Sequence, residues 1–205
     1  MTEDIDIKQK QEVLHIKKLV DGAQNSNMDA FGQLYDLYLP KIYRYCTARI
    51  RNIPEAEDLA EEIFVKVLTN IHKFQWSQSI GGANPFTSWL FRIAHNHVVS
   101  FTRKLSTKTQ TSELGEWIPD KEPTPSQEVE LQLSIDEVFT AVQKLPTAQR
   151  DVIMMRFSAG LSIAETAASL DKKESNVKVL QHKAVTSLKK MLQDDQGLIS
   201  KELIL

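Results

Sequence analysis

Cationic and aromatic side chains gather in one part of this sequence, and acidic side chains are missing from it. From Ile63 to Ser112 there is no Asp or Glu, whereas Lys and Arg recur throughout the segment. Two aromatic residues, Phe74 and Trp76, stand at the start of a glycine-containing loop. Aromatic rings stack on unpaired bases and cations neutralise phosphates, so the pattern favours contact with single-stranded nucleic acid.

A helix is expected after this loop, from Phe86 to Leu105, because its apolar residues recur at helical spacing. Its predicted buried face consists of Leu90, Ile93, Ala94, His97, Phe101 and Leu105. Its opposite, acid-free face consists of Arg92, His95, Asn96, Val99 and Arg103. The loop aromatics and this basic face together predict a surface for nucleic acid.

A second pattern lies between Leu145 and Lys190, where three helices are expected. Gly160 suits a helix end, because glycine adopts the left-handed conformation at little cost. Ser162 and Glu165 have the spacing of a capping box, which starts the next, short helix. Residues 171–173 then turn into a longer amphipathic helix. This is the helix-turn-helix arrangement, whose last helix enters the DNA major groove.

The exposed face of that last helix is expected to carry cationic and hydrogen-bonding groups: Lys172, Lys173, Ser175, Asn176, Lys178, Val179, His182 and Lys183. Such groups suit phosphate neutralisation and contacts with base edges. An ordinary three-helix unit with a solvated, lysine-rich face has the same pattern. This stretch alone therefore leaves both interpretations open.

Acidic side chains gather just before the acid-free segment, on a helix expected to begin at Pro54. They are Glu55, Glu57, Asp58, Glu61 and Glu62. The opposite side of the helix carries an apolar stripe of Leu59, Ile63, Val67 and Ile71. The carboxylates form either a solvated face or a docking surface for a basic partner. Segregated acidic and basic surfaces suggest two different partners.

Composition excludes several classes of protein. The single cysteine, Cys46, excludes an intramolecular disulfide and fits a reducing cytoplasm. There is no run of about eighteen apolar residues and no signal-peptide pattern, so no membrane contact is expected. His95 and His97 lie two apart on a helix and cannot chelate one metal. We expect a binding protein without metal, cofactor or catalytic residues, and not an enzyme.

The chain is predicted to be all-α, with two small helical domains. Residues 1–105 form the first domain, and Pro40 predicts a kink or break in its second helix. Residues 106–130 form a flexible linker, because they are rich in Ser, Thr, Pro and charge. Residues 131–192 form the second domain, and 193–205 form a tail. The second domain starts with an apolar stripe of Leu131, Ile135, Val138, Phe139 and Val142.

Four stretches occur in an order that resembles a bacterial RNA polymerase sigma factor of the extracytoplasmic-function (ECF) group. They are 29–38, 55–64, 85–96 and the helix-turn-helix from Leu145. The resemblance implies a promoter-specificity subunit. Its first domain would be a sigma region 2 helical bundle, which docks on core polymerase and recognises and melts the −10 element. Its second domain would be a sigma region 4 helix-turn-helix, which reads the −35 element.

The resemblance also implies partners and residue roles. Glu57, Asp58, Glu61 and Glu62 would dock on the clamp of the largest polymerase subunit, and the polymerase flap would hold the C-terminal domain. Melting would capture an unstacked base. The −10 contacts would come from Phe74, Trp76, Asn84, Phe86, Thr87, Trp89, Arg92, His95, Asn96, Arg103 and Lys104. Duplex −35 DNA would be read by Lys173, Ser175, Asn176, Lys178, Val179, His182 and Lys183. A cytoplasmic location and an anti-sigma factor are implied as well.

Two other interpretations remain open. A free-standing helix-turn-helix regulator would bind duplex operator alone, but it would leave residues 29–105 without a purpose. An interaction adaptor that has lost DNA binding is compatible with the modest basicity after Lys183.

Overall fold

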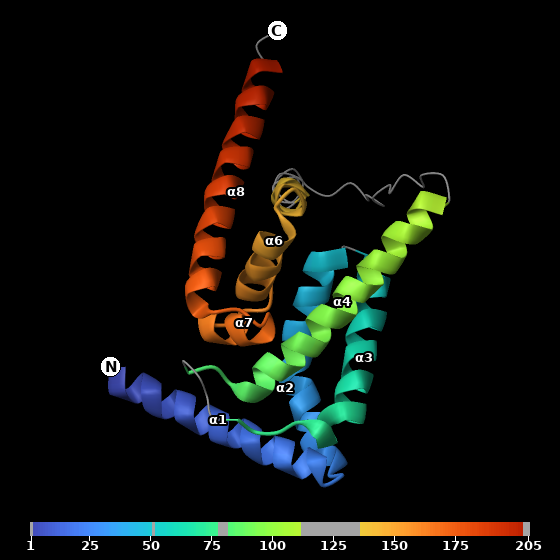
Figure 1. Ribbon diagram of the computed structural model, residues 1–205, viewed down its shortest axis with the longest axis vertical. Coiled ribbons are helices and arrows are strands. Elements are labelled where there is room, and N and C mark those ends of the chain that lie inside the picture. The colour runs from blue at the N-terminus through green and yellow to red at the C-terminus, as the bar shows by residue number, and fades with distance from the viewer. Residues whose placement is uncertain (1, 51, 78–81, 112–135, 203–205) are drawn as a thin grey trace, which may run out of the picture.

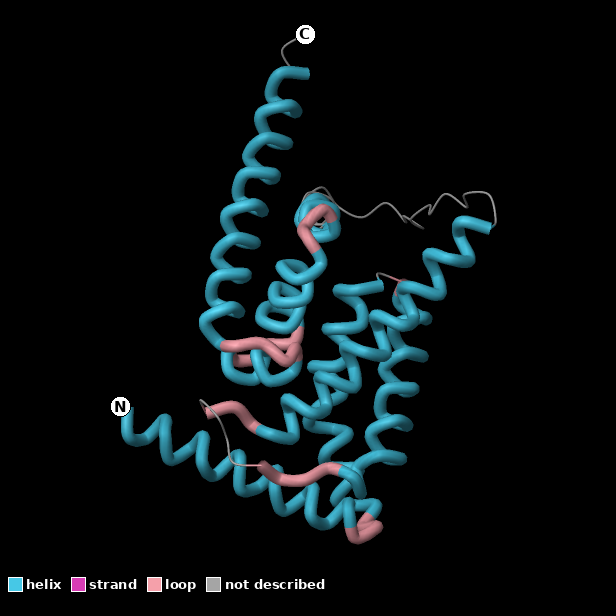
Figure 2. Tube along the Cα trace, viewed as in Figure 1, coloured by secondary structure: helices cyan, strands magenta, loops and turns pink. Residues whose placement is uncertain are grey.

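The computed structural model describes residues 2–50, 52–77, 82–111 and 136–202, which form helices joined by short turns (Figures 1 and 2). No strand occurs among these residues, which confirms the all-α prediction. None of the helices in these ranges is long and apolar enough to cross a membrane.

The helices fall into two sets along the chain. The N-terminal unit consists of α1 (Thr2–Gln24), α2 (Met28–Ile50), α3 (Ile53–Asn70), the 3₁₀ turn η1 (Ile71–Lys73) and α4 (Pro85–Thr111). The C-terminal unit consists of helical residues 136–143, α6 (Thr147–Ile153), the π-helical turn η2 (Met154–Ser158), α7 (Ile163–Ser169) and α8 (Glu174–Glu202). Residues 112–130 of the predicted linker, with Leu131 and Ile135 of the apolar stripe, lie outside the described residues.

Helix α3 has the apolar stripe expected from its spacing. Leu59, Ile63 and Val67 are at most 1% exposed, and Ile71 in η1 is 3% exposed. Burying each such side chain contributes about 1.5–3 kcal/mol relative to leaving it in water. Asn52 caps the helix, because its side-chain oxygen accepts a hydrogen bond from the backbone of Glu55 at 3.1 Å. The stripe fixes which way the carboxylates opposite it point.

Helix α4 has a different buried face from the expected one. Leu90 and Ala94 are fully buried, but Leu105 is 42% exposed. Phe91 and Val98, which were not expected in the core, are fully buried instead. The reason is that α4 packs against α2 and α3 and also against α7, so its covered surface is wider than the single stripe inferred from spacing.

Helix ends and helix crossings depend on individual residues. Helix α1 contains Gly22, where a Cβ would lie only 2.9 Å from the Cβ of Ala30. Glycine therefore permits the close approach of α1 to α2. Pro40 lies inside the continuous helix α2, so the break allowed for there does not occur. Helix α4 extends to Thr111, and α8 runs to Glu202 through residues expected to form a tail.

The C-terminal unit has the expected helix-turn-helix. Gly160 has φ of 73° at the end of the first helix. The capping box is complete: Ser162 N donates to Glu165 Oε2 at 2.8 Å, and Glu165 N donates to Ser162 Oγ at 3.1 Å. Asp171 takes φ of 53° in the tight turn before α8. Buried Val152, Ala167 and Val177 hold α6, α7 and α8 together.

The two units pack against each other. Buried side chains of the C-terminal unit, among them Ile153, Met155 and Leu161, belong to the same hydrophobic cluster as the core of the N-terminal unit. Helix α7 lies against α4, and η2 lies against α2 (Figure 1). The sequence alone did not predict how the two units are placed relative to each other.

Candidate nucleic-acid interface

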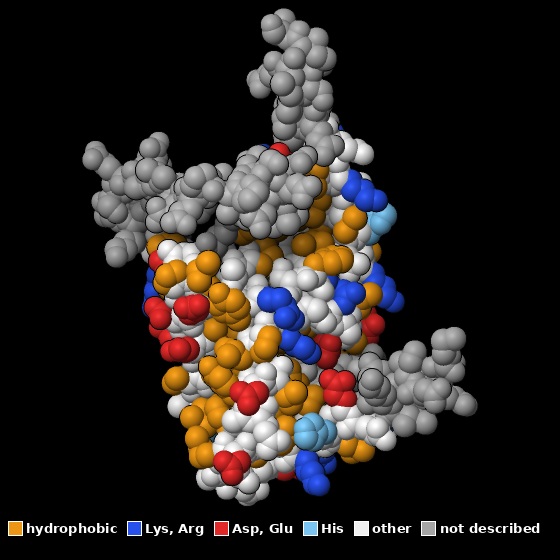
Figure 3. Space-filling model, turned by 180° about the vertical axis from the view of Figure 1, so that it is seen from behind, with side chains coloured by type: hydrophobic (Ala, Val, Ile, Leu, Met, Phe, Trp, Pro, Cys, Tyr) orange, Lys and Arg blue, Asp and Glu red, His pale blue; other side chains and the backbone are white. Residues whose placement is uncertain are grey.

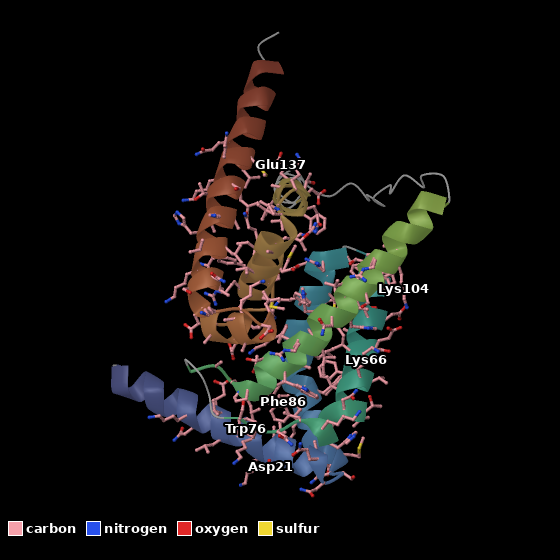
Figure 4. The ribbon with its side chains drawn as sticks, viewed as in Figure 1. Asp21, Lys66, Trp76, Phe86, Lys104 and Glu137 are labelled. Carbon is pink, nitrogen blue, oxygen red and sulfur yellow. The ribbon has the colours of Figure 1, made fainter. Side chains whose placement is uncertain are left out.

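Aromatic side chains surround the start of α4. The ring of Phe74 lies 5.7 Å from Trp76, 5.6 Å from Phe86 and 5.2 Å from Trp89, measured between centroids. Trp76 and Phe86 lie close together between the start of α4 and α1 (Figure 4). Such edge-on and tilted pairs contribute about 0.5–1.5 kcal/mol each beyond the area they bury. The cluster therefore fixes the loop to the helix.

Four residues expected to touch −10 DNA are buried: Phe74, Asn84, Phe86 and Thr87, each at most 8% exposed. The Asn84 side-chain oxygen accepts hydrogen bonds from the backbone nitrogens of Phe86 (3.0 Å) and Thr87 (3.2 Å). The Thr87 hydroxyl pairs with the Tyr38 hydroxyl at 2.8 Å. These groups satisfy one another and are covered in this structure, so the direct contact expected from sequence is not open to DNA in this conformation. They position α4 and its loop.

A groove between α3 and α4 collects polar and cationic groups. It has a volume of about 460 Å³ and is lined by Lys66, Asn70, Lys73, Trp89, Ile93, Asn96, His97 and Ser100. Trp89 and Asn96 were expected here from sequence. Lys66 and Asn70 of α3 and Lys73 of η1 were not, although their spacing of four and three residues places them on one side of the helix and the turn that follows it. Lys66 and Lys104 both lie on this side of the molecule (Figure 4).

A second pocket of about 260 Å³ lies beside the groove, at the loop end of α4. Lys73, Trp89 and Arg92 line it from the N-terminal unit, and Ala168 of α7 closes one side. Arg92, Asn96, Arg103 and Lys104 are exposed along α4. The structure thus brings a half-buried indole and several cations together, which is the combination that binds unpaired bases and their phosphates.

The two histidines of α4 have different environments. His97, expected in the core, lies at the groove and pairs with Glu62 of α3 at 2.6 Å. His95 lies between the units: its Nδ1 is 3.1 Å from the Tyr45 hydroxyl, and its Nε2 is 3.9 Å from Asp151 Oδ2. Burial lowers the pKa of His95 below its ordinary value, because the charged imidazolium loses solvent. No described group of three or more His, Cys, Asp or Glu side chains is arranged to hold a metal.

The acidic residues Glu57, Asp58, Glu61 and Glu62 are all exposed on α3. Two apolar side chains continue their surface by helical spacing, Val65 at 61% exposure and Leu68 at 38%. Acidic and apolar side chains share the edge of the molecule where α3 lies, at the left of Figure 3. A mixed acidic and apolar strip is suited to docking on a basic protein surface.

The start of α8 presents the other predicted DNA-binding surface. Lys173, Ser175, Asn176, Lys178, Val179, His182 and Lys183 are all exposed. Val177 and Ala184 are fully buried on the opposite side. The predicted residues therefore share one exposed face of α8, and packing on the opposite side fixes the direction in which this face points.

Comparisons with known proteins agree with this arrangement. The profile of Sigma-70 region 2 matches residues 34–107, and that of Sigma-70 region 4 matches residues 141–190. The ECF RNA polymerase sigma factor BldN of Streptomyces coelicolor is 35% identical over 180 residues, which cover 87% of this chain and 66% of that protein. The ECF RNA polymerase sigma factor SigW of Bacillus subtilis is 30% identical over 189 residues, covering 87% of this chain and 97% of that protein.

Among solved structures, the sigma factor RpoE in complex with the anti-sigma factor NepR, from Bartonella quintana, aligns with a TM-score of 0.59 at 24% identity. The alignment covers 80% of this chain and 96% of that one, and it supports the fold. The matches to region 2 and region 4 identify a two-region transcription factor. The chain belongs to the ECF family of RNA polymerase sigma factors.

Proposed function

We propose that this sigma factor directs core RNA polymerase to promoters by dividing three tasks among three surfaces. The acidic and apolar face of α3 docks on the polymerase clamp. The start of α8 reads duplex −35 DNA. The groove and pocket along α4 hold the unpaired −10 strand after melting.

One observation carries the proposal: the three surfaces lie on different helices and point in directions that packing fixes. On α3, the carboxylates lie opposite side chains that are at most 1% exposed. On α8, the polar set lies opposite Val177 and Ala184. Each surface can therefore contact a different macromolecule within one complex, without rearrangement of its own helix.

Residues of the −10 surface divide into two roles. Trp89, Arg92 and Asn96 lie where a strand can touch them, with Lys66 of α3 and Lys73 of η1 adding phosphate contacts. The buried aromatic cluster beneath holds them in place. Melting then costs a few kcal/mol for each unstacked base, which stacking on an indole and charge neutralisation offset.

An anti-sigma factor is the regulatory partner that this proposal includes. RpoE of Bartonella quintana is crystallised with one, and it shares the fold of this chain. Among the described residues, the exposed surfaces of α3 and α8 are where such a protein would block polymerase and DNA.

The test is transcription in vitro with purified core polymerase and a fragment library of the host genome. We expect initiation at discrete sites only when the chain is present. Absence of such initiation above core polymerase alone, across a range of salt concentrations, contradicts the proposal. Duplex binding by the chain without any effect of polymerase would favour the free-standing regulator.

A pair of charge reversals then tests the division of tasks. Asp58→Arg should weaken association with core polymerase and spare duplex DNA binding. Lys178→Glu should do the reverse, since it removes a cation from the α8 face and adds an anion. If both variants fail at the same step, the assignment of surfaces is wrong.

A further inference from the structure

Val179 is an exposed apolar side chain in the middle of the polar face of α8. It is 52% exposed. Residues three and four positions away are its neighbours on the helix surface, and all of them are polar: Ser175, Asn176, His182 and Lys183. Val179 belongs to neither of the two hydrophobic clusters formed by the described residues. It therefore stands as a single apolar group among polar ones and forms no apolar patch with its helical neighbours.

Neither packing nor helix propensity accounts for a valine at this position. The next residue, Leu180, packs against the cluster of Val152, Ala167 and Val177, which gives it a structural role. Val179 has no part in that cluster. A β-branched residue also forms a helix less readily than alanine, because it loses side-chain freedom against the preceding turn. The small cost of Val179 to the helix is thus not offset by burial within the chain.

The direction of Val179 is fixed by packing on the other side of α8, which runs along the outside of the C-terminal unit (Figure 1). Val177 and Ala184 are fully buried on that side. Because each helical residue advances by roughly 100°, Val179 lies about 200° around the helix from Val177. Arg156 of η2 adds a polar contact, since its Nε donates to Gln181 Oε1 at 3.0 Å. Rotation of α8 about its axis would break these contacts, so Val179 stays at the centre of the face proposed to read −35 DNA.

The major groove of DNA offers one apolar group to such a side chain. Its base edges carry hydrogen-bond donors and acceptors, and the C5-methyl group of thymine is the exception. A valine placed against this methyl group removes apolar surface of both partners from water, which is favourable. A valine placed against another base edge removes water from a donor or acceptor and supplies no hydrogen bond in return, which is unfavourable. Both effects favour thymine.

The polar neighbours of Val179 can hold the helix in place while this contact forms. Lys178 and Lys183 are exposed on the same face and can neutralise phosphates. Phosphate contacts fix the register of a protein on the duplex, but they carry no sequence information directly. The apolar contact of Val179 therefore adds sequence information that is independent of charge.

We propose that Val179 is a specificity-determining residue, which selects thymine at one position of the −35 element by contact with its C5-methyl group. The inference rests on the proposed reading of duplex −35 DNA by α8, and it names the chemical group that is read there. The base pair at this position is A·T, with the thymine methyl group facing Val179.

The experiment uses RNA polymerase holoenzyme assembled from core polymerase and the full chain. The −35 segment of a promoter fragment found by transcription in vitro is randomised, and the duplexes that the holoenzyme retains are sequenced. Each thymine of the selected element is then replaced by deoxyuridine, one at a time, which removes only the methyl group. At one position this replacement should raise the Kd of the wild-type holoenzyme by about fourfold, the scale of one buried methylene group.

Two variants accompany the wild-type chain. Val179→Ala should bind the selected duplex about fourfold more weakly and lose most of its response to deoxyuridine at that position. The variant should keep its fold, because alanine is the better helix former at an exposed position. Val138→Ala is the matched control, since it makes the same change at a residue that is 42% exposed and lies outside α8. It should respond to deoxyuridine as the wild type does.

A selected element that requires no thymine overturns the inference. Equal responses of the wild type and Val179→Ala to deoxyuridine at every thymine also overturn it, because another group then reads the methyl. These two outcomes leave the proposed −35 role of α8 intact. If the holoenzyme selects no sequence in the −35 segment, that proposed role is wrong and the inference fails with it. The two kinds of failure can therefore be told apart.

Discussion

Replacement of Phe86 by alanine tests whether this side chain positions α4 and its loop or contacts DNA directly. Phe86 is 1% exposed, and its ring centroid lies 5.5 Å from Tyr38, 5.6 Å from Phe74 and 5.8 Å from Trp89. Truncation of a buried Phe costs about 3–5 kcal/mol. For a unit of about 100 residues this lowers the melting temperature by at least about 12 °C, at about 4 °C for each kcal/mol. Global stabilities of 5–15 kcal/mol leave most of the protein folded at 25 °C.

Denaturant unfolding followed by helical circular dichroism measures the loss of stability, and binding of single-stranded and duplex DNA measures function. We expect Phe86→Ala to weaken the binding of single-stranded DNA, because the loop before α4 loses its packing against the ring. Duplex binding through α8 should be retained. Asn96→Ala is the matched control, because Asn96 is exposed on the same helix. It should lose single-strand binding with stability unchanged within about 0.5 kcal/mol. A Phe86→Ala variant that lost DNA binding at a stability cost below about 1 kcal/mol would refute the positioning role.

Two more predictions concern the C-terminal unit and its interface. Ser162→Ala removes the side chain that accepts from Glu165 N and should destabilise this unit by about 0.5–2 kcal/mol, measured by denaturant unfolding with Ser187→Ala as the control. Burial in the folded chain lowers the pKa of His95, so the folded state binds fewer protons than the unfolded state at this side chain. The contribution of His95 to stability is present above the ordinary pKa of about 6.5 and is lost as the pH falls below it. The free energy of unfolding, measured with denaturant, should therefore fall as the pH decreases from about 7.5 to about 5.5. The fall should be smaller in His95→Gln, and an equal fall in that variant would contradict the assignment.

Much of the fold could be predicted because most helices here have one buried side. On α3, one stripe meets the core and the rest meets solvent, so the spacing of Leu59 and Ile63 gives the right answer. On α4 the same reasoning failed. The helix is covered by both units, and contacts from residues far away in the chain bury Phe91 and Val98. Spacing along one helix carries no information about a second covering surface.

The candidate site was predicted in part for a related reason. Polar faces identify exposed residues, so the carboxylates of α3 and the polar set of α8 were assigned correctly to the surface. An aromatic residue does not indicate whether it is exposed or buried, because the same ring can stack on a base or pack in a core. In this structure Phe74 and Phe86 are buried. The contact of Arg92 with Ala168 joins residues 76 positions apart and has no local signal at all.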